Sequence, residues 1–145
     1  IESGEDVCVL CEGDPFFYGS FMHIYARLRF EAPIEVIPAI TGMSAAWTAT
    51  GLPITWGDNI LTILTGTLSK EALVDKISTT DAAVIMKVGQ NLDKIRAAIT
   101  LAERESDAFI VEYAAMSNQS VCKLVEYTKA VAPYFSIIIL HGEAK

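Results

Sequence analysis

The segment from residue 60 to residue 105 reads ILTILTGTLSKEALVDKISTTDAAVIMKVGQNLDKIRAAITLAERE and decides the expected fold. Its two apolar runs, Ile60–Thr65 and Ala82–Lys87, have the length and composition of strands. A stretch of helical length with polar and apolar residues at helical spacing follows each of them, at Lys70–Ser78 and at Leu92–Glu105. The segment is therefore expected to form two strand–helix units in succession.

The same alternation continues on both sides of this segment. The remaining strand-like runs are Val7–Cys11, Ile34–Ile37, Ala108–Tyr113 and Ser136–Leu140. Two further helices are expected, at Met43–Thr50 and Ser120–Val131, and Asn91 stands where the N-cap of the helix at Leu92 belongs. Strands that alternate with helices predict an α/β layered fold with a largely parallel sheet.

A boundary between two domains is expected at Gly51–Asp58, which contains Pro53 and two glycines and follows a predicted helix. Only two strands precede it, which is too few for a stable independent sheet. The chain also begins with Ile1 and not with Met. We therefore expect an N-terminally truncated fragment, in which residues 1–51 are the C-terminal part of a first α/β domain and residues 52–145 are a second α/β domain.

Composition and charge narrow the classes of function. Of the 145 residues, 52% are hydrophobic and 20% are charged, which provides for a packed core. The formal charge of −7, with no cluster of Lys and Arg, argues against nucleic acid as a partner. Apolar runs such as Ile137–Leu140 fall far short of the ~18 residues needed to cross a bilayer, and no basic leader precedes an apolar stretch. A cytoplasmic protein without a membrane partner is expected.

The cysteines do not predict a metal site. Cys8 and Cys11 have CxxC spacing, but they lie in a predicted buried strand, where residues three apart point to opposite faces. Together with Cys122 they make an odd number, which fits a reducing compartment. We interpret Cys8 and Cys11 as small core residues.

The most distinctive segment, Glu12–Ser20, follows a predicted strand directly, at the end where open α/β sheets bind ligands. Gly13 allows a ligand to approach the backbone closely, and Asp14 places a carboxylate beside it. Pro15 fixes the turn and can begin a helix. The alternative, equally compatible with these residues, is that Gly13 makes the turn and Asp14 caps that helix.

A second turn, Pro38–Ala46, also lies between a predicted strand and a predicted helix. Thr41 and Ser44 offer hydroxyl groups beside the free N–H groups of a helix start, which favours a carboxylate ligand. Ordinary helix capping would explain the same residues.

Taken in order, these segments resemble the tetrapyrrole methylase family over essentially the whole chain. The matching segments are Gly13-Asp14-Pro15, Pro38-Ala39-Ile40-Thr41, Gly51-Leu52-Pro53-Ile54-Thr55, Ala83-Val84-Ile85-Met86, Val111-Glu112-Tyr113-Ala114 and Ser136-Ile137-Ile138-Ile139. More narrowly, Glu12–Ser20, Thr41–Ser44 and Ile54–Asp58 resemble the branch that methylates precorrin-2 at C20 in cobalamin (corrin) biosynthesis.

The resemblance implies a two-domain α/β homodimer that binds S-adenosyl-L-methionine and methylates a small-molecule tetrapyrrole. The positions that match the family's cofactor contacts are Glu12, Gly13, Asp14, Phe17, Thr41, Gly42, Met86 and Ala114. Many relatives have Gly at the position of Ala114, so the extra methyl group is a departure. The family's first strand and its Gly-Pro-rich loop have no counterpart here, which implies that the fragment itself lacks part of the site.

The implied reaction is an in-line attack of a meso carbon on the sulfonium methyl group, for which the protein provides orientation and exclusion of water. No nucleophilic side chain is required, no metal site is predicted, and the catalytic residues are unknown. Asp14 could favour the cationic sulfonium or assist proton loss. His23 and His141 are more typical of packing or surface residues than of catalysts. The acidic chain offers few cations for a polycarboxylate substrate, among them Arg27, Arg29 and Lys87.

Two alternatives remain open at this point. A sibling methylase would use the same cofactor on another precorrin, on uroporphyrinogen III or on an unrelated acceptor such as diphthine. A non-catalytic nucleotide-binding α/β module is the other alternative. Against it, no GxGxxG or GxxxxGK[ST] motif follows a predicted strand, and Thr65–Lys70 is only superficially similar to a phosphate-binding loop.

Overall fold

The computed structural model describes residues 4–144. Contacts divide the chain into two compact units, one ending at Gly42 and one beginning at Met43. Each unit is described here by itself. The assignment of residues 1–51 and 52–145 to two domains stays a prediction.

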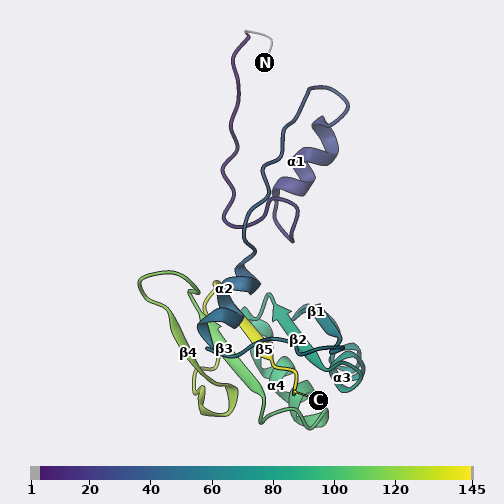
Figure 1. Ribbon diagram of the computed structural model, residues 1–145, viewed down its shortest axis with the longest axis vertical. Coiled ribbons are helices and arrows are strands. Elements are labelled where there is room, and N and C mark those ends of the chain that lie inside the picture. The colour runs from purple at the N-terminus through teal and green to yellow at the C-terminus, as the bar shows by residue number, and fades with distance from the viewer. Residues whose placement is uncertain (1–3, 145) are drawn as a thin grey trace. The chain divides into compact units, whose positions relative to one another are not determined.

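The first unit contains one helix, α1 (Phe21–Leu28), among its described residues (Figure 1). The strands expected at Val7–Cys11 and Ile34–Ile37 are not formed, so that prediction was wrong. A strand requires a hydrogen-bonded neighbour, and residues 4–42 form no such ladder with one another. Cys8 and Cys11 are exposed and not buried, which corrects the second expectation for this segment.

The second unit is built on a mixed sheet of five strands. They are β1 (Leu61–Thr65), β2 (Ala82–Met86), β3 (Ala108–Glu112), β4 (Ser120–Lys123) and β5 (Ser136–Leu140), in the spatial order β1-β2-β5-β3-β4. Only β1 and β2 are parallel, and all other neighbours are antiparallel. The prediction of a largely parallel sheet was therefore wrong. A parallel crossover needs a connection of about a dozen residues, usually a helix, and β3, β4 and β5 have no α-helix between them.

The helices agree with the sequence pattern at three positions. They are α2 (Gly42–Ala49), α3 (Lys70–Ser78) and α4 (Leu92–Leu101), with single 3-10 turns at Gly89–Asn91 and Leu124–Glu126. The expected helix at Ser120–Val131 was wrong, because β4 and the second of these turns occupy that stretch. No helix in the part of the chain that the structure describes combines the length and apolarity that a bilayer crossing requires.

The ends of α4 differ in part from the sequence pattern. Asn91 stands at the N-cap position as expected, but its side chain caps no amide of the helix. The helix ends at Leu101 and not at Glu105, and Glu103 has a left-handed backbone (φ 56°) just beyond it. A left-handed residue is a common way to end a helix.

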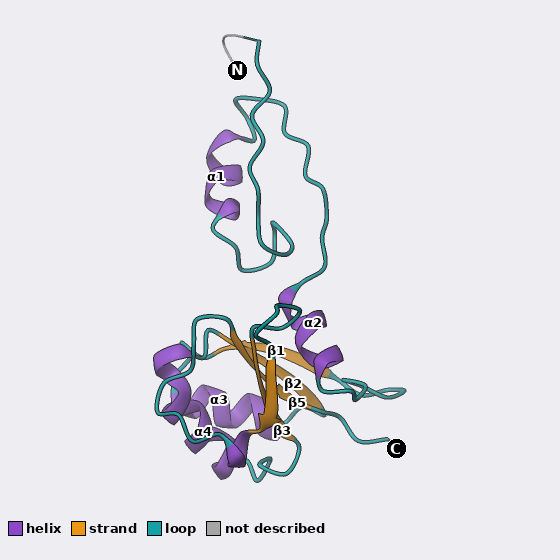
Figure 2. Ribbon diagram, turned by 90° about the vertical axis from the view of Figure 1, so that its left-hand side faces the viewer, coloured by secondary structure: helices purple, strands orange, loops and turns teal. Residues whose placement is uncertain are grey.

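Helices cover the two faces of the sheet unequally. Figure 2 shows α3 and α4 on one face and α2 on the other. The larger apolar cluster, which includes Leu73, Ile85, Ile95 and Ile138, lies on the α3/α4 face. The smaller cluster has four buried members, Ala46, Val84, Val111 and Ile139, and lies on the α2 face. Alternate residues of one strand thus belong to different cores, as the two-residue period of a strand requires.

The segment Gly51–Asp58 packs against the end of β5 and its following residues. The buried His141 ring donates from Nδ1 to the Pro53 carbonyl oxygen at 2.9 Å, and its Nε2 lies 3.0 Å from the Thr50 hydroxyl oxygen. The next backbone amide, of Gly142, donates to the Ile54 carbonyl oxygen at 3.0 Å. His141 therefore holds this segment against the sheet, which agrees with its interpretation as a packing residue.

A buried carboxylate fixes the end of β3. Glu112 is only 5% exposed, and it accepts hydrogen bonds from the Tyr127 hydroxyl group and from the Lys129 ammonium group, the latter at 2.9 Å. Burial opposes ionisation of Glu112, but the bonds from Tyr127 and Lys129 and the Lys129 charge outweigh it and lower the pKa of this carboxyl group. Burial and the neighbouring Glu112 raise the pKa of Tyr127. The cluster ties residues 127–129 to the strand.

Replacing Gly66 by Ala is expected to destabilise the second unit. A Cβ atom at Gly66 would lie 2.7 Å from the Lys87 carbonyl oxygen and 2.8 Å from Ile95 Cδ1. Overpacking of this kind costs about 1–3 kcal/mol. Urea unfolding of Gly66→Ala should show this loss, whereas the neighbouring exposed Thr67→Ala should change stability by less than about 0.5 kcal/mol. Equal stability of Gly66→Ala and the wild type would contradict the tight packing of β1 against the turn after β2.

Glu112→Gln is expected to lower stability in a pH-dependent way. The lowered pKa of native Glu112 means that its ionised form stabilises the fold above the unfolded pKa of about 4.3, and that this contribution is lost as pH falls through the native value. At pH 7 the variant should lose about 1–3 kcal/mol of unfolding free energy, toward the lower end because the Lys129 side chain is 55% exposed. Urea unfolding at pH 7 and near pH 3 should show the difference shrinking in acid. The exposed Glu126→Gln is the matched control, and a difference independent of pH would disprove the charged role.

Candidate functional site

The two turns singled out by the sequence lie against each other. Asp14 Oδ1 accepts a hydrogen bond from the Phe16 amide at 2.9 Å, and Oδ2 accepts one from the Ala39 amide at 3.1 Å. Gly13 has a left-handed backbone (φ 85°), and a Cβ atom there would lie 3.6 Å from the Ile40 carbonyl oxygen and 3.8 Å from the Gly42 nitrogen. The expected proximity of Gly13-Asp14 to Thr41-Gly42 is thus confirmed.

Asp14 does not cap a helix. The chain turns at residues 15–18, and α1 begins only at Phe21. The capping alternative for Asp14 was therefore wrong. A carboxylate that bonds two backbone amides 23 residues apart in sequence, Phe16 and Ala39, instead joins two loops.

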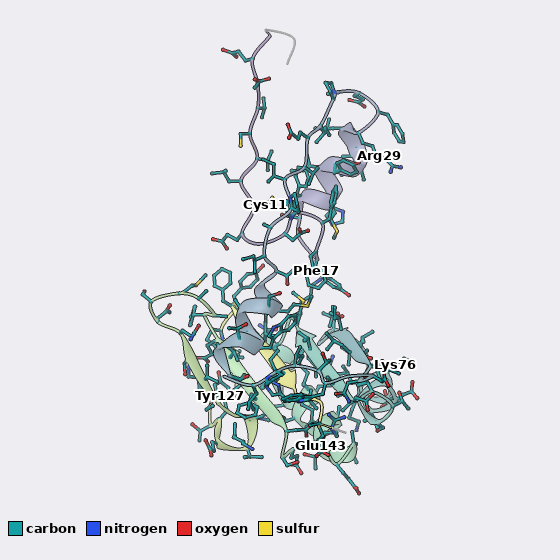
Figure 3. All side chains as sticks on the ribbon, viewed as in Figure 1. Cys11, Phe17, Arg29, Lys76, Tyr127 and Glu143 are labelled. Atoms are coloured by element: carbon teal, nitrogen blue, oxygen red, sulfur yellow. The ribbon has the colours of Figure 1, made fainter. Side chains whose placement is uncertain are left out.

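The other predicted residues of the first unit surround this junction. The Phe17 amide donates to the Asp14 carbonyl oxygen at 3.2 Å, and its half-buried ring meets the Tyr18 ring edge-on at a centroid distance of 5.0 Å. Figure 3 labels Phe17 on this loop and Cys11 on the extended segment that leads into it. Glu12 is exposed and Thr41 is half-buried.

Met86 and Ala114 lie in the second unit, at the edge of the sheet that is formed by the ends of the strands. Met86 ends β2, and Ala114 comes two residues after the end of β3. Both strands pair antiparallel with β5, so they run parallel to each other and end at the same edge. Since neighbouring strands lie about 4.8 Å apart, the ends of β2 and β3 are about 10 Å apart, with the start of β5 between them.

The first turn of α2 adjoins the same surface. Met43 and Trp47 pack against the smaller apolar cluster, and so do Met86 and Ala114. All four side chains are only partly buried. The residue that follows Gly42 therefore lies in one apolar group with the two predicted contacts of the sheet.

Unusual backbone conformations concentrate beside the predicted residues. Among the described residues, five that are not glycine have a left-handed backbone, and these are Tyr18, Lys87, Glu103, Tyr113 and Ala115. All except Glu103 adjoin a predicted residue, namely Phe17, Met86 or Ala114. Such conformations cost about 1–3 kcal/mol each and cluster at functional sites. They support the choice of these three positions independently of side-chain chemistry.

The residues fit a cofactor with an amino-acid end and a less polar body in two respects. The turn at Gly13 and Gly42 exposes backbone without side-chain bulk, so that polar atoms of a ligand can reach amide and carbonyl groups. The edge at Met86 and Ala114 presents apolar side chains. A bulky or charged residue at these positions would have argued against such a ligand.

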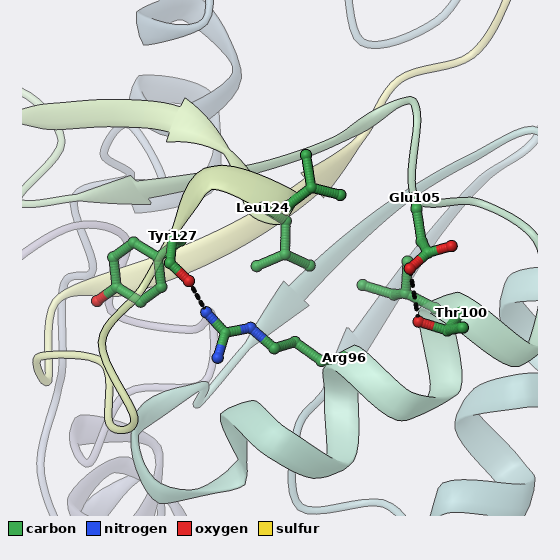
Figure 4. A pocket seen from close by; sticks show the side chains of 7 residues that line it. Arg96, Thr100, Glu105, Leu124 and Tyr127 are labelled. Atoms are coloured by element: carbon green, nitrogen blue, oxygen red, sulfur yellow. Dashed lines mark hydrogen bonds between the residues drawn. The ribbon is translucent and has the colours of Figure 1, made fainter.

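A hollow of about 360 Å³ lies elsewhere, between α4 and the 3-10 turn at Leu124–Glu126 (Figure 4). Its polar side chains are engaged within the protein. Arg96 donates to the Tyr127 carbonyl oxygen, and the Thr100 hydroxyl group donates to Glu105 at 2.8 Å. Arg96, Ile99 and Leu124 belong to the α4 side of the sheet and none of the predicted residues lines this hollow. It is therefore not the candidate site.

Sequence reasoning missed one functional feature of this edge, the Glu112 cluster. In this cluster, Glu112 at the end of the strand that leads to Ala114 is bonded by Tyr127 and Lys129, which lie 15 and 17 residues farther along the chain. Only a helix was expected over that region, so no local signal pointed to it. The neighbouring Cys122 is half-buried, and burial, then the Glu126 and Glu112 charges, raise the pKa of its thiol. This thiol is therefore poorly suited to act as a nucleophile.

Curated relatives match almost the whole chain. A precorrin-2 C(20)-methyltransferase from Sinorhizobium sp is 46% identical over 142 residues, which are 98% of this chain and 58% of that protein. The cobalamin biosynthesis protein CobIJ from Mycobacterium tuberculosis is 36% identical over 142 residues, 98% of this chain and 28% of that protein. The chain thus spans a little over half of the first relative and less than a third of the second.

Solved structures show the same fold at low sequence identity. The methyltransferase CobJ aligns with a TM-score of 0.71 at 17% identity, over 97% of this chain and 66% of that one. The cobalt precorrin-4 methyltransferase CbiF aligns with a TM-score of 0.72 at 20% identity, over 89% and 61%. A uroporphyrin-III C-methyl transferase from Thermus thermophilus, complexed with S-adenyl homocysteine, aligns with a TM-score of 0.61 at 22% identity, over 88% and 62%.

Residues 1–128 also match the family described as Tetrapyrrole (Corrin/Porphyrin) Methylases. This match covers both turns of the first unit and the sheet edge of the second. The chain belongs to the tetrapyrrole methylase family.

Proposed function

We propose that the chain is the part of an S-adenosylmethionine-dependent methyltransferase that methylates precorrin-2 at C20 in cobalamin biosynthesis. The observation that carries the proposal is the 46% identity to a precorrin-2 C(20)-methyltransferase over 98% of the chain. The relatives that match at 36% also belong to cobalamin biosynthesis by name. Membership of the family supports the cofactor and the substrate class, and this identity favours the particular tetrapyrrole.

The proposed cofactor site combines both sets of residues. Backbone of Glu12, Gly13 and Asp14 and of the turn at Thr41 and Gly42 would hold the amino-acid end of the cofactor. Phe17, Met86 and Ala114 would contact its less polar body. The two turns meet at Gly13, where an added Cβ atom would lie 3.6 Å from the Ile40 carbonyl oxygen. This proximity supports the first set of contacts. The shared apolar cluster beside α2 supports the second.

The residues would act by binding and orientation. The bound cofactor supplies an activated methyl group, so no side chain of the protein has to form a covalent bond. Apolar side chains at Met43, Met86 and Ala114 would exclude water from the transferred group, and the backbone turns would hold the donor in line with the acceptor carbon. Effects of orientation can lower a barrier by about 7–11 kcal/mol at the upper end.

A sibling methylase is the second candidate. Two of the solved structures with the same fold are named as methyltransferases of cobalt precorrin-4 and of uroporphyrin III, and CobJ is named as a methyltransferase; all three are 17–22% identical to this chain. Such a likeness concerns the fold and leaves the acceptor open. A homodimer is also proposed on the ground of the family resemblance alone.

Calorimetric titration tests the cofactor. S-adenosylhomocysteine is expected to bind the chain, and ATP and NAD are expected not to bind, because no phosphate-binding loop follows a strand. Binding of ATP or NAD in place of S-adenosylhomocysteine would support a nucleotide-binding module and overturn the proposal. Incubating a protein that carries this chain at the length of its relatives with labelled cofactor and a panel of tetrapyrroles tests the acceptor, and methylation of precorrin-2 at C20 is expected.

Gly13→Ala is expected to weaken S-adenosylhomocysteine binding about tenfold, because a left-handed backbone costs a residue with a side chain about 1–2 kcal/mol. Relaxation of that strain would move the amide groups that face the ligand. Gly19→Ala is the matched control, since its φ is not in the left-handed region and its Cβ would meet the Pro15 carbonyl oxygen at an ordinary 3.5 Å. Equal affinities of Gly13→Ala and the wild type would contradict a cofactor contact at this turn.

A further inference from the structure

The Asp14 carboxylate is bound to backbone on both of its oxygens. Oδ1 lies 2.9 Å from the Phe16 nitrogen, in its own turn, and Oδ2 lies 3.1 Å from the Ala39 nitrogen, in the other turn. Both partners are backbone amides, so the positions of the two donors are set by the fold of the main chain and not by a side-chain rotamer. The two bonds therefore fix the distance between the two loops.

The backbone at Gly13 leaves little room for adjustment. The hypothetical Cβ atom at this residue is already in van der Waals contact with Ile40 and Gly42. The neighbouring Asp14 bond to Ala39 lies one residue before Ile40. The hydrogen bond fixes the separation of the turns, the absence of a side chain at Gly13 permits their close approach, and the separation determines where their backbone groups point.

We infer that Asp14 is a positioning residue, which holds the two turns at the separation that the cofactor requires, and that it serves neither as a base nor as the counter-charge of the sulfonium. The inference rests on the proposed function for the ligand, whereas the contact between the loops is independent of it. Both carboxylate oxygens are turned toward backbone amide donors, one in each turn. A base or counter-ion would need an oxygen directed at the reacting group.

The side-chain type also matches this role. Asn has one acceptor oxygen, so its amide nitrogen would oppose one of the two backbone donors. Glu keeps the charge but places the oxygens one methylene group farther from the backbone. A positioning role therefore predicts that both Asp14→Asn and Asp14→Glu lose function, whereas a role of charge alone predicts that Asp14→Glu keeps most of it.

Affinities for two forms of the cofactor distinguish the roles. S-adenosylmethionine carries the sulfonium charge, and S-adenosylhomocysteine is its neutral thioether. Calorimetry on Asp14→Asn should show both dissociation constants raised by the same factor, about tenfold, since each lost bond involves a charged acceptor. A loss confined to S-adenosylmethionine would show a counter-charge and overturn the inference. Glu31→Gln removes one exposed negative charge from the same unit and is the matched control.

Amide hydrogen exchange tests the contact without any ligand. The Ala39 amide should exchange slowly in the wild type and in Glu31→Gln, and faster in Asp14→Asn and Asp14→Glu. Unchanged exchange at Ala39 in Asp14→Asn would overturn the inference even if cofactor affinity fell. If the wild type binds neither form of the cofactor, the proposed function fails, and the exchange result alone then decides whether Asp14 joins the loops.

Discussion

The position of β5 between β2 and β3 is the constraint on which the second unit depends. β5 pairs antiparallel with both neighbours, so that Ile85 lies opposite Ile138 and Glu112 lies opposite Ser136. This arrangement makes β2 and β3 parallel without a direct contact between them. It also places Met86, which pairs with Thr65 at the end of β2, and Ala114, two residues beyond the end of β3, at the same edge of the sheet.

Polar contacts secure the ends of this arrangement. At the amino end of β2, Arg104 donates to the carbonyl oxygens of Thr80 and Asp81 at 2.8 Å and pairs with Asp107. At the opposite end, the Glu112 cluster holds the chain that follows β4. Each end uses a charged group with several partners, and such groups specify geometry more strictly than apolar packing does. The apolar clusters stabilise the sheet, and these contacts determine where its edges lie.

Much of the fold follows from local sequence, and the remainder depends on distant partners. The spacing of apolar residues in Ile60–Thr65 and in Lys70–Ser78 can be read within each segment alone, and the structure forms β1 and α3 there. The region Ser120–Val131 was misassigned because Ser120–Lys123 gains its strand conformation from pairing with β3. Val7–Cys11 has the composition of a strand but no partner among residues 4–42, so composition alone was insufficient. The largely parallel sheet was inferred from the alternation of strands and helices. This alternation ends after β3, because no α-helix lies between β3, β4 and β5.

The contact between the two candidate turns could be anticipated for a different reason. Gly13-Asp14 and Thr41-Gly42 were chosen as two loops that follow predicted strands, and the Asp14–Ala39 bond shows them in contact across 25 residues. The two loops lie together although the strands themselves did not form, and the choice of these residues as a cofactor site stays a prediction. The bond itself could not be foreseen, because a carboxylate at a turn is equally compatible with capping. The Glu112 cluster could not be foreseen either, since its partners are 15 and 17 residues away in a region of misassigned structure.

The central strand of the sheet, β5, is also the last of these five strands in chain order. Until residues 136–140 leave the exit tunnel, the nascent chain holds the β1–β2 pair and the β3–β4 pair as two ribbons with unpaired inner edges. Two-stranded ribbons are marginally stable in water, and exposed edges favour pairing with other chains. This five-stranded sheet can therefore be completed only after residues 136–140 have been synthesised.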